Sequence, residues 1–280
     1  MEMLMSIEIP EIGLGTWELR GKKCIEVVKM ALDLGYRHID TAFAYENHKE
    51  IAKALKVYAR DELFLTTKVD LGQLSADVYL SQANDQNIDE SVESICDLAL
   101  TELGVEYLDL LLIHWPDRNR PLEEILAALH KMVTKEKIRF VGVSNYTKHH
   151  LQDAYDANVA VAFNQVEFHP YLYQKQLLDF CKQHNTHLIA YRPLGKGKLL
   201  KEESLFSEIG KAHQKSAAQV VLRWIIQKRV PVIVKSVSSD HLKENLEIFD
   251  FTLSPEEEKK IDKLSCEKRF CGVTWNEFDY

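Results

Sequence analysis

The stretch YLDLLLI, residues 107–113, is almost continuously apolar and follows a segment with a helical pattern. A strand with one face in water alternates apolar and polar residues, whereas a continuous apolar run is typical of a parallel strand buried on both faces. In the segment before it, Val92, Ile95, Ala99 and Leu103 recur at the spacing of one helix face. The apolar run and the helical spacing before it together predict an amphipathic helix followed by a buried parallel strand.

The same alternation continues along the chain. The other strand candidates are residues 38–40, 63–68, 140–143, 159–166, 188–191 and 232–234, with a weaker eighth candidate at 246–251. Helical spacing recurs at residues 24, 27, 28 and 31 and at residues 218, 221, 222 and 225, and Ser254–Glu257 forms a capping box. Eight strands alternating with helices, without a linker, predict an α/β fold, a (β/α)8 TIM barrel forming a single domain over residues 1–280. A doubly wound sheet fits the alternation too, but it normally carries a GxGxxG turn, which this chain lacks.

Length, charge and cysteine usage agree with a barrel enzyme. The 280 residues carry 35 Lys+Arg and 43 Asp+Glu, a net charge of −8, which argues against nucleic acid and anionic membranes as partners. The five cysteines are scattered without a CxxC pair, as expected for free thiols in a reducing compartment. Neither a signal peptide nor an apolar run long enough to span a membrane is visible. We therefore expect a cytoplasmic protein.

Ionisable residues stand where three of the predicted strands end. Asp40 ends one apolar run, Lys68 ends the next, His114 follows the third, and Tyr45 lies five residues after Asp40. Taken singly, Asp40 could cap a helix, Lys68 could lie along the rim, His114 could be a core histidine and Tyr45 could pack in a loop. Because active sites of such barrels lie at the carboxyl ends of the strands, the four side chains are expected to converge on one rim.

This combination of side chains suits the protonation of an alkoxide. A buried Asp40–Lys68 pair keeps the lysine charged, and a positive charge beside Tyr45 is expected to lower the phenol pKa from its usual ~10. Tyr45 would then serve as a general acid, and His114 could donate a hydrogen bond to the substrate oxygen. These residues supply half of a carbonyl reduction, and the other half requires a hydride donor.

The chain also resembles the aldo-keto reductase superfamily, from Gly13 to about Leu264. The motifs are GLGTW (13–17), GYRHIDTAFAYEN (35–47), LTTKV (65–69), YLDLLLIHWP (107–116), VGVSNY (141–146), NQVEFHP (164–170), AYRPLG (190–195) and KSVSSDHLKEN (235–245). It is similar to the small prokaryotic-type members, such as aldehyde and 2,5-diketogluconate reductases. The resemblance implies an N-terminal β-hairpin before Trp17, a C-terminal substrate loop and a monomer.

The resemblance also assigns roles. Tyr45 would be the proton donor, Lys68 and Asp40 its pKa partners, and His114 the residue that orients the carbonyl. The implied cofactor is NADPH, and the residues implied to bind it are Thr16, Trp17, Asp40, Ser144, Asn145, Gln165, Tyr191, Arg192, Leu194, Lys196, Lys235, Ser236, Val237, His241, Glu244 and Asn245. The substrate, a small carbonyl compound, would contact Trp17, Tyr45, His114, Trp115 and Trp275, with Phe43 and Phe278 as further aromatic walls.

Four positions depart from the family pattern. Arg192 replaces a serine, Val234 replaces a proline, and His241 replaces an arginine that commonly holds the 2′-phosphate. Because imidazole is mostly neutral at pH 7, we expect a preference for NADPH that is weaker than usual, with some use of NADH. The loop at residues 69–72 lacks the usual aromatic side chain, and Asp70 instead places a carboxylate near the substrate pocket.

Two other functions are compatible with parts of the sequence. The close ligand pairs His149–His150 and Cys181–His184 are expected on helices that face solvent, so no metal site is predicted. A non-catalytic, nicotinamide-nucleotide-binding regulatory subunit is the alternative to an enzyme. The presence of Asp40, Tyr45, Lys68 and His114 together favours turnover.

Overall fold

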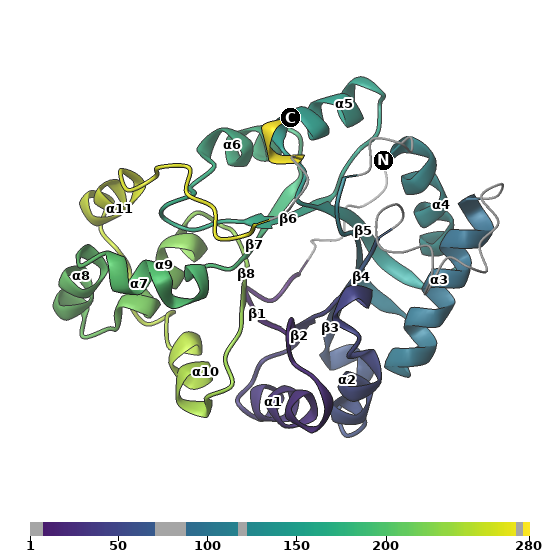
Figure 1. Cartoon of the computed structure of the whole chain (residues 1–280), viewed down its shortest axis with the longest axis horizontal. Helices are drawn as coiled ribbons and strands as arrows, with labels where there is room; N and C mark the ends of the chain where they lie inside the picture. Colours follow the sequence, from purple (N-terminus) through teal and green to yellow (C-terminus); the bar gives the residue numbers. More distant parts are fainter. Residues whose placement is uncertain (1–7, 71–87, 117–121, 273–276) are drawn as a thin grey trace.

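The computed structural model describes residues 8–70, 88–116, 122–272 and 277–280. Eight parallel strands close into a barrel in chain order, with the last strand paired to the first (Figure 1). The strands are β1 (Ile12–Gly15), β2 (His38–Asp40), β3 (Phe64–Val69), β4 (Leu108–Ile113), β5 (Ile138–Ser144), β6 (Phe163–Glu167), β7 (His187–Tyr191) and β8 (Val232–Val234). The fold is the α/β (β/α)8 barrel that the sequence predicts.

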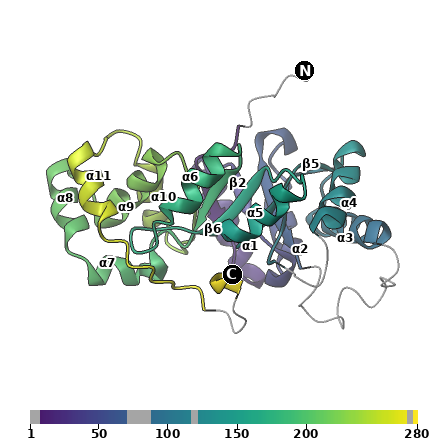
Figure 2. The same cartoon turned by 90° about the horizontal axis from the view of Figure 1, so that it is seen from above.

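Helices surround the strands, and α8 and α11 lie beyond α9 at one end of the molecule (Figures 1 and 2). The helices are α1 (Gly21–Asp33), α2 (His48–Leu55), α3 (Ile88–Leu103), α4 (Leu122–Thr134), α5 (Lys148–Asp156), α6 (Lys175–Gln183), α7 (Lys198–Glu202), α8 (Leu205–His213), α9 (Ala217–Gln227), α10 (Ser239–Leu246) and α11 (Pro255–Asp262). Short 3₁₀ turns are η1 (Phe43–Tyr45), η2 (Arg60–Glu62), η3 (Gly195–Gly197) and η4 (Glu277–Asp279). In the parts of the chain that the structure describes, none of these helices combines the length and apolarity of a membrane span.

The predicted helix faces are buried as their spacing requires. Val92, Ile95, Ala99 and Leu103 of α3 all pack into the core, as do the corresponding residues of α1. The predicted capping box is also present, because the Ser254 side chain accepts a hydrogen bond from the backbone N–H of Glu257, and the Glu257 carboxylate accepts one from the backbone N–H of Ser254. Local sequence therefore sets where these helices begin and which side faces the barrel.

Strand β4 is buried along its whole length, as its apolar sequence predicts. Its one polar residue, Asp109, is neutralised by two arginines: its carboxylate lies 2.6 Å from the guanidinium of Arg60 and 2.9 Å from that of Arg139. Both guanidinium groups also lie over the ring of Tyr107, at 3.9 and 4.2 Å from its centroid. Burial of the carboxylate is tolerated because its hydrogen bonds and charge partners are supplied locally.

The eighth strand is not where the sequence places it. Residues 246–251 form the end of α10 and the turn after it, and Phe249 is about half exposed. The missing strand is β1, Ile12–Gly15, which pairs in parallel with both β2 and β8 and thereby closes the barrel. These residues belong to the stretch before Trp17 expected to form a hairpin. Residues 8–11 of that stretch are in no strand, and residues 1–7 lie outside the described residues.

The short strand escaped recognition because two of its four residues are glycine, which weakens a strand pattern. Its glycines have a steric reason. A Cβ atom on Gly13 would lie 2.8 Å from the ring of His38 and 2.7 Å from Ile233. The His38 ring cannot move away easily, because it is fully buried and bonded to the Thr66 hydroxyl at 2.8 Å.

A Gly13→Ala substitution should therefore destabilise the barrel by about 1–3 kcal/mol, the usual cost of overpacking a core. The measurement is urea unfolding followed by circular dichroism. Gly272→Ala is the matched control, because a Cβ there meets nothing within 4 Å. Equal unfolding free energies for the two variants would contradict the steric reading of β1.

Candidate active site

Most of the residues singled out in the sequence line one cavity of about 970 Å³ at the carboxyl ends of the strands. Those that the structure places on its wall are Thr16, Trp17, Asp40, Tyr45, Lys68, His114, Trp115, Ser144, Asn145, Gln165, Tyr191, Arg192, Leu194, Lys196, Lys235, Ser236, Val237, His241, Glu244 and Asn245. Trp275 lies outside the described residues. The closure of eight strands into a ring thus brings together residues that are more than 200 positions apart.

A buried ion pair lies in the wall of this cavity. The Lys68 ammonium at the end of β3 lies 2.6 Å from the Asp40 carboxylate at the end of β2, and both residues are at most 3% exposed. Lys68 also donates to the backbone oxygen of Thr41, while the second Asp40 oxygen accepts a hydrogen bond from Gln165 at 2.7 Å. Burial alone would lower the pKa of Lys68, but the Asp40 carboxylate and the Tyr45 phenol outweigh it and raise the pKa above its ordinary value.

Tyr45 lies above this pair at the end of η1. The Lys68 ammonium is 5.2 Å from the centroid of the Tyr45 ring, and the ring centroids of Tyr45 and His114 are 6.0 Å apart. Burial raises the pKa of Tyr45, Lys68 lowers it and Asp40 raises it again, so that the pKa stays above its usual value. The expectation that Lys68 brings it below 10 is therefore wrong for this structure, because desolvation of the phenolate outweighs the nearby positive charge. The phenol keeps its proton at neutral pH.

His114 follows β4 and is held on two sides. Its Nδ1 lies 2.9 Å from a carboxylate oxygen of Asp70, the residue that follows β3. Its backbone oxygen accepts a hydrogen bond from the side-chain amide of Asn145 at 2.9 Å. Both contacts fix the histidine between neighbouring βα loops.

A group of amide and hydroxyl side chains continues the wall from His114. The Tyr191 hydroxyl donates to the Asn145 amide oxygen at 2.6 Å, and the Ser144 hydroxyl donates to the backbone oxygen of Gln165 at 2.8 Å. Burial raises the pKa of Tyr191 well above its ordinary value, so the phenol is neutral. Asn145 holds a left-handed backbone conformation, φ 66°, which asparagine tolerates better than most residues.

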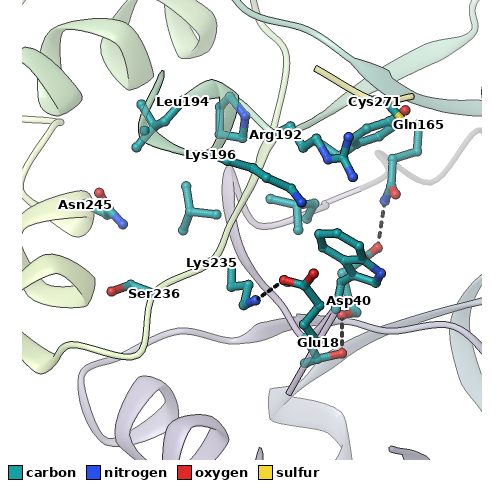
Figure 3. A pocket seen from close by; sticks show the side chains of 18 of the residues that line it. Glu18, Asp40, Gln165, Arg192, Leu194, Lys196, Lys235, Ser236, Asn245 and Cys271 are labelled. Atoms are coloured by element: carbon teal, nitrogen blue, oxygen red, sulfur yellow. Dashed lines mark hydrogen bonds and ion pairs between the residues drawn. The ribbon is translucent and has the colours of Figure 1, made fainter. Parts of the chain in front are cut away.

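Three cations gather around the indole of Trp17. Lys196, Arg192 and Lys235 lie 4.1, 5.0 and 5.7 Å from its ring centroid. In Figure 3 the side chains of Lys196 and Lys235 occupy the space between Asp40 and Gln165 on one side and Ser236 and Asn245 on the other. Lys235 also forms an ion pair with Glu18, at 3.2 Å.

The C-terminal segment is the chain after α11, residues 263–272. It contributes Cys271 and Gly272 to the wall of the cavity and is tied to the barrel by Glu167 at the end of β6. This fully buried carboxylate accepts the backbone N–H groups of Phe270 and Cys271 at 2.7 and 3.0 Å and pairs with His169. Burial raises the pKa of Glu167, but His169 and the two backbone N–H groups outweigh it and hold the pKa below its usual value. Arg192 donates to the backbone oxygen of Phe270 at 2.7 Å, so this departure from the family pattern fastens the same segment.

Sequence reasoning missed several residues of the cavity wall and misplaced others. Glu18 and Cys271 line the cavity, although the sequence did not predict them there. Phe43, expected in the substrate wall, instead packs in the core, with its ring centroid 4.7 Å from that of His48. Phe278 is also absent from the cavity lining, but it packs on Trp115, which lines the cavity, with ring centroids 5.8 Å apart.

Only one member of each candidate metal pair is buried: His149 is exposed and His184 partly exposed, whereas His150 and Cys181 are buried. His150 is buried against the start of α5, where it bonds Thr147, and Cys181 is buried in α6. The described residues contain no group of three or more His, Cys, Asp or Glu side chains arranged to hold a metal ion. All five cysteines are free thiols.

Comparison with known proteins agrees with this geometry. The sequence model described as "Aldo/keto reductase family" matches residues 11–265. The chain belongs to the aldo/keto reductase family. It is 37% identical to the 9,11-endoperoxide prostaglandin H2 reductase of Trypanosoma cruzi, over 98% of this chain and 94% of the relative. It is 40% identical to the glyoxal reductase of Bacillus subtilis, over 94% of this chain and 91% of the relative.

A solved structure of the family has the same barrel. An aldo-keto reductase from a Medee basin deep-sea metagenome library superimposes with a TM-score of 0.84 at 34% identity, over 96% of this chain and 97% of that one. Membership of the aldo/keto reductase family makes the protein an oxidoreductase, and the reductases among its relatives support reduction of carbonyl groups.

The Asp40–Lys68 pair generates a prediction about stability. Asp40→Asn or Lys68→Met alone leaves one buried charge without its partner, and each should cost about 3–5 kcal/mol of unfolding free energy. The double variant removes both charges and should cost clearly less than the sum of the two. Urea unfolding of the four proteins measures this coupling.

Lys175→Met is the control, because it breaks an exposed ion pair with Asp179, and such pairs contribute at most about 1 kcal/mol. If the losses of unfolding free energy in the two single variants simply added in the double variant, the two charges would not stabilise each other.

Proposed function

We propose that this protein is an NADPH-dependent aldo-keto reductase that reduces small aldehydes and ketones to alcohols. The observation that carries the proposal is the buried Asp40–Lys68 pair beneath Tyr45 and His114, at one end of a cavity whose other part is lined by cations. Polar groups of these types, held in a largely desolvated wall, are suited to proton transfer and to stabilising a developing oxyanion.

The cavity fits an anionic dinucleotide. The chain carries a net charge of −8, yet Arg192, Lys196 and Lys235 all surround Trp17 inside the cavity. Such a local concentration of cations is what a pyrophosphate and a 2′-phosphate require. Under this proposal Tyr191 stacks on the nicotinamide ring, Ser144, Asn145 and Gln165 hold its carboxamide, and Lys235 and Ser236 hold the adenosine end.

Each catalytic side chain then has a distinct task. The bound nicotinamide supplies the hydride. Tyr45, whose pKa burial raises, keeps its proton until the substrate oxygen becomes basic enough to take it. Lys68 retains its charge beside Asp40 and stabilises the phenolate that remains. His114 donates a hydrogen bond that orients the carbonyl oxygen toward Tyr45.

The preference for NADPH rests on Lys235. In this structure Glu18 lies 3.2 Å from its ammonium and so competes with any phosphate for the same cation. His241 lies on the same cavity wall, at the start of α10. The arginine expected at this position would carry a permanent positive charge, which an imidazole does not. We therefore propose a moderate preference for NADPH, with measurable use of NADH.

The substrate class follows from the wall beside Tyr45. Trp17 and Trp115 line the cavity, and Phe278 packs on Trp115. Aromatic walls with few polar contacts suit a range of small aldehydes, dicarbonyls and keto-sugars better than one tightly selected compound. A monomer acting in the cytoplasm is part of the same proposal.

Replacing Tyr45 by phenylalanine tests the proposed mechanism. The phenol is the proposed proton donor, so Tyr45→Phe should lower turnover of methylglyoxal at least ~100-fold while NADPH binding changes little. Turnover is followed by the absorbance of the reduced nicotinamide, and binding by quenching of tryptophan fluorescence. Tyr58→Phe is the matched control, because that hydroxyl bonds Asp33 at the surface.

Full activity of Tyr45→Phe would overturn the proton-transfer role. Binding of NADPH by the unaltered protein, without oxidation by any of a panel of aldehydes, would instead support the regulatory-subunit alternative.

Cofactor preference is tested by two opposite substitutions. Lys235→Met removes the proposed 2′-phosphate partner and should raise the KM for NADPH roughly tenfold or more, with little change for NADH. His241→Arg adds a permanent cation and should lower the KM for NADPH selectively. Steady-state kinetics with both cofactors measures the change, with Lys201→Met as the control, because Lys201 is exposed on α7. Equal effects on the two cofactors would refute a 2′-phosphate site here.

A further inference from the structure

Asp70 is a carboxylate with no role in the proposed mechanism, although it touches one of the proposed catalytic residues. Its Oδ2 lies 2.9 Å from Nδ1 of His114, and the two side chains are only 8% and 12% exposed. Asp70 stands two residues after Lys68, directly after the end of β3. Because side chains two apart in an extended segment point to the same side, Lys68 and Asp70 reach one face of the site.

The contact restricts how His114 can carry protons. An ionised carboxylate only accepts hydrogen bonds, so Nδ1 of His114 must be the protonated, donating nitrogen. A neutral imidazole has only one N–H, which leaves Nε2 with a lone pair and unable to donate to a carbonyl oxygen. His114 can therefore bind Asp70 and donate to a substrate at the same time only as an imidazolium.

The charges around the ring point the same way. Among the described residues, Asp40 on β2, Tyr45 on η1 and Lys68 on β3 are the titratable groups that line this end of the cavity with His114, and Asp70, which follows β3, contacts the His114 ring. With the phenol neutral, these described groups comprise two carboxylates and a single ammonium. An imidazolium at His114 balances this cluster, whereas a neutral imidazole leaves a net negative charge where an oxyanion is to form.

We propose that Asp70 is a positioning residue that holds His114 as an imidazolium, with Nδ1–H bound to Asp70 and Nε2–H available to the substrate carbonyl. This inference rests on the proposed reductase function. A charged donor forms a shorter and stronger hydrogen bond than a neutral one, and its charge opposes that of the developing alkoxide. Asp70 thus acts on the reaction through His114 alone.

Two substitutions separate orientation from charge. Asp70→Asn keeps an oxygen that accepts from Nδ1–H but removes the carboxylate charge, and Asp70→Leu removes both. The proposal expects kcat to fall at least ~10-fold in Asp70→Asn and further in Asp70→Leu, with the KM for NADPH unchanged in both. Asp61→Asn, an exposed carboxylate in η2, is the control and should leave kcat unchanged.

The decisive readout does not need turnover. Nitrogen-15 NMR of the histidine side chains at pH 7, with His114→Gln used to assign the signal, should show both ring nitrogens of His114 protonated in the unaltered protein. In Asp70→Asn the same ring should show one unprotonated nitrogen. A neutral His114 in the unaltered protein, or unaltered kcat in Asp70→Asn, would overturn the proposal. Absence of turnover in the unaltered protein would refute the reductase function, while the NMR result would still decide the protonation of His114.

Discussion

Lys68 and Asp40 face each other at 2.6 Å inside a wall from which water is almost excluded, and neither charge could remain there alone. Their remaining hydrogen-bonding capacity is taken up by the Thr41 backbone and the Gln165 amide, so the pair joins β2 and β3 to β6 across the barrel. The two ions thus form the centre of a network that places a phenol and an imidazole above them. The chemistry proposed for this protein depends on that network being complete.

Desolvation has two opposite consequences in this cavity. It raises the pKa of Tyr45, which keeps the phenol protonated, and it would lower the pKa of Lys68 if Asp40 and Tyr45 did not counteract it. The result is a neutral acid directly above a permanent cation. A phenol that gives up its proton only when a strongly basic oxygen appears is well matched to carbonyl reduction, and it limits ionisation of the site between turnovers.

The cationic part of the cavity is held together differently. Trp17 provides a surface over which Arg192, Lys196 and Lys235 gather, while Glu167 and Arg192 fasten the C-terminal segment to the rim through Phe270 and Cys271. Arg192 belongs to both groups. The arginine that departs from the family pattern therefore couples the position of the C-terminal segment to the cationic part of the cavity.

Sequence alone determined the barrel class, seven of its strands, the helix faces and the convergence of Asp40, Lys68, His114 and Tyr45, because hydrophobic period and strand-end position are local properties. It misplaced the eighth strand, because the two glycines of Ile12–Gly15 are required by contacts with β2 and β8 rather than by strand propensity. The Asp70–His114 contact had a sequence signal, the spacing of two residues from Lys68. Only the tertiary structure decided the pKa of Tyr45, the partner of Arg192 and the anchoring role of Glu167. These depend on which groups are buried together, and burial arises when distant segments meet.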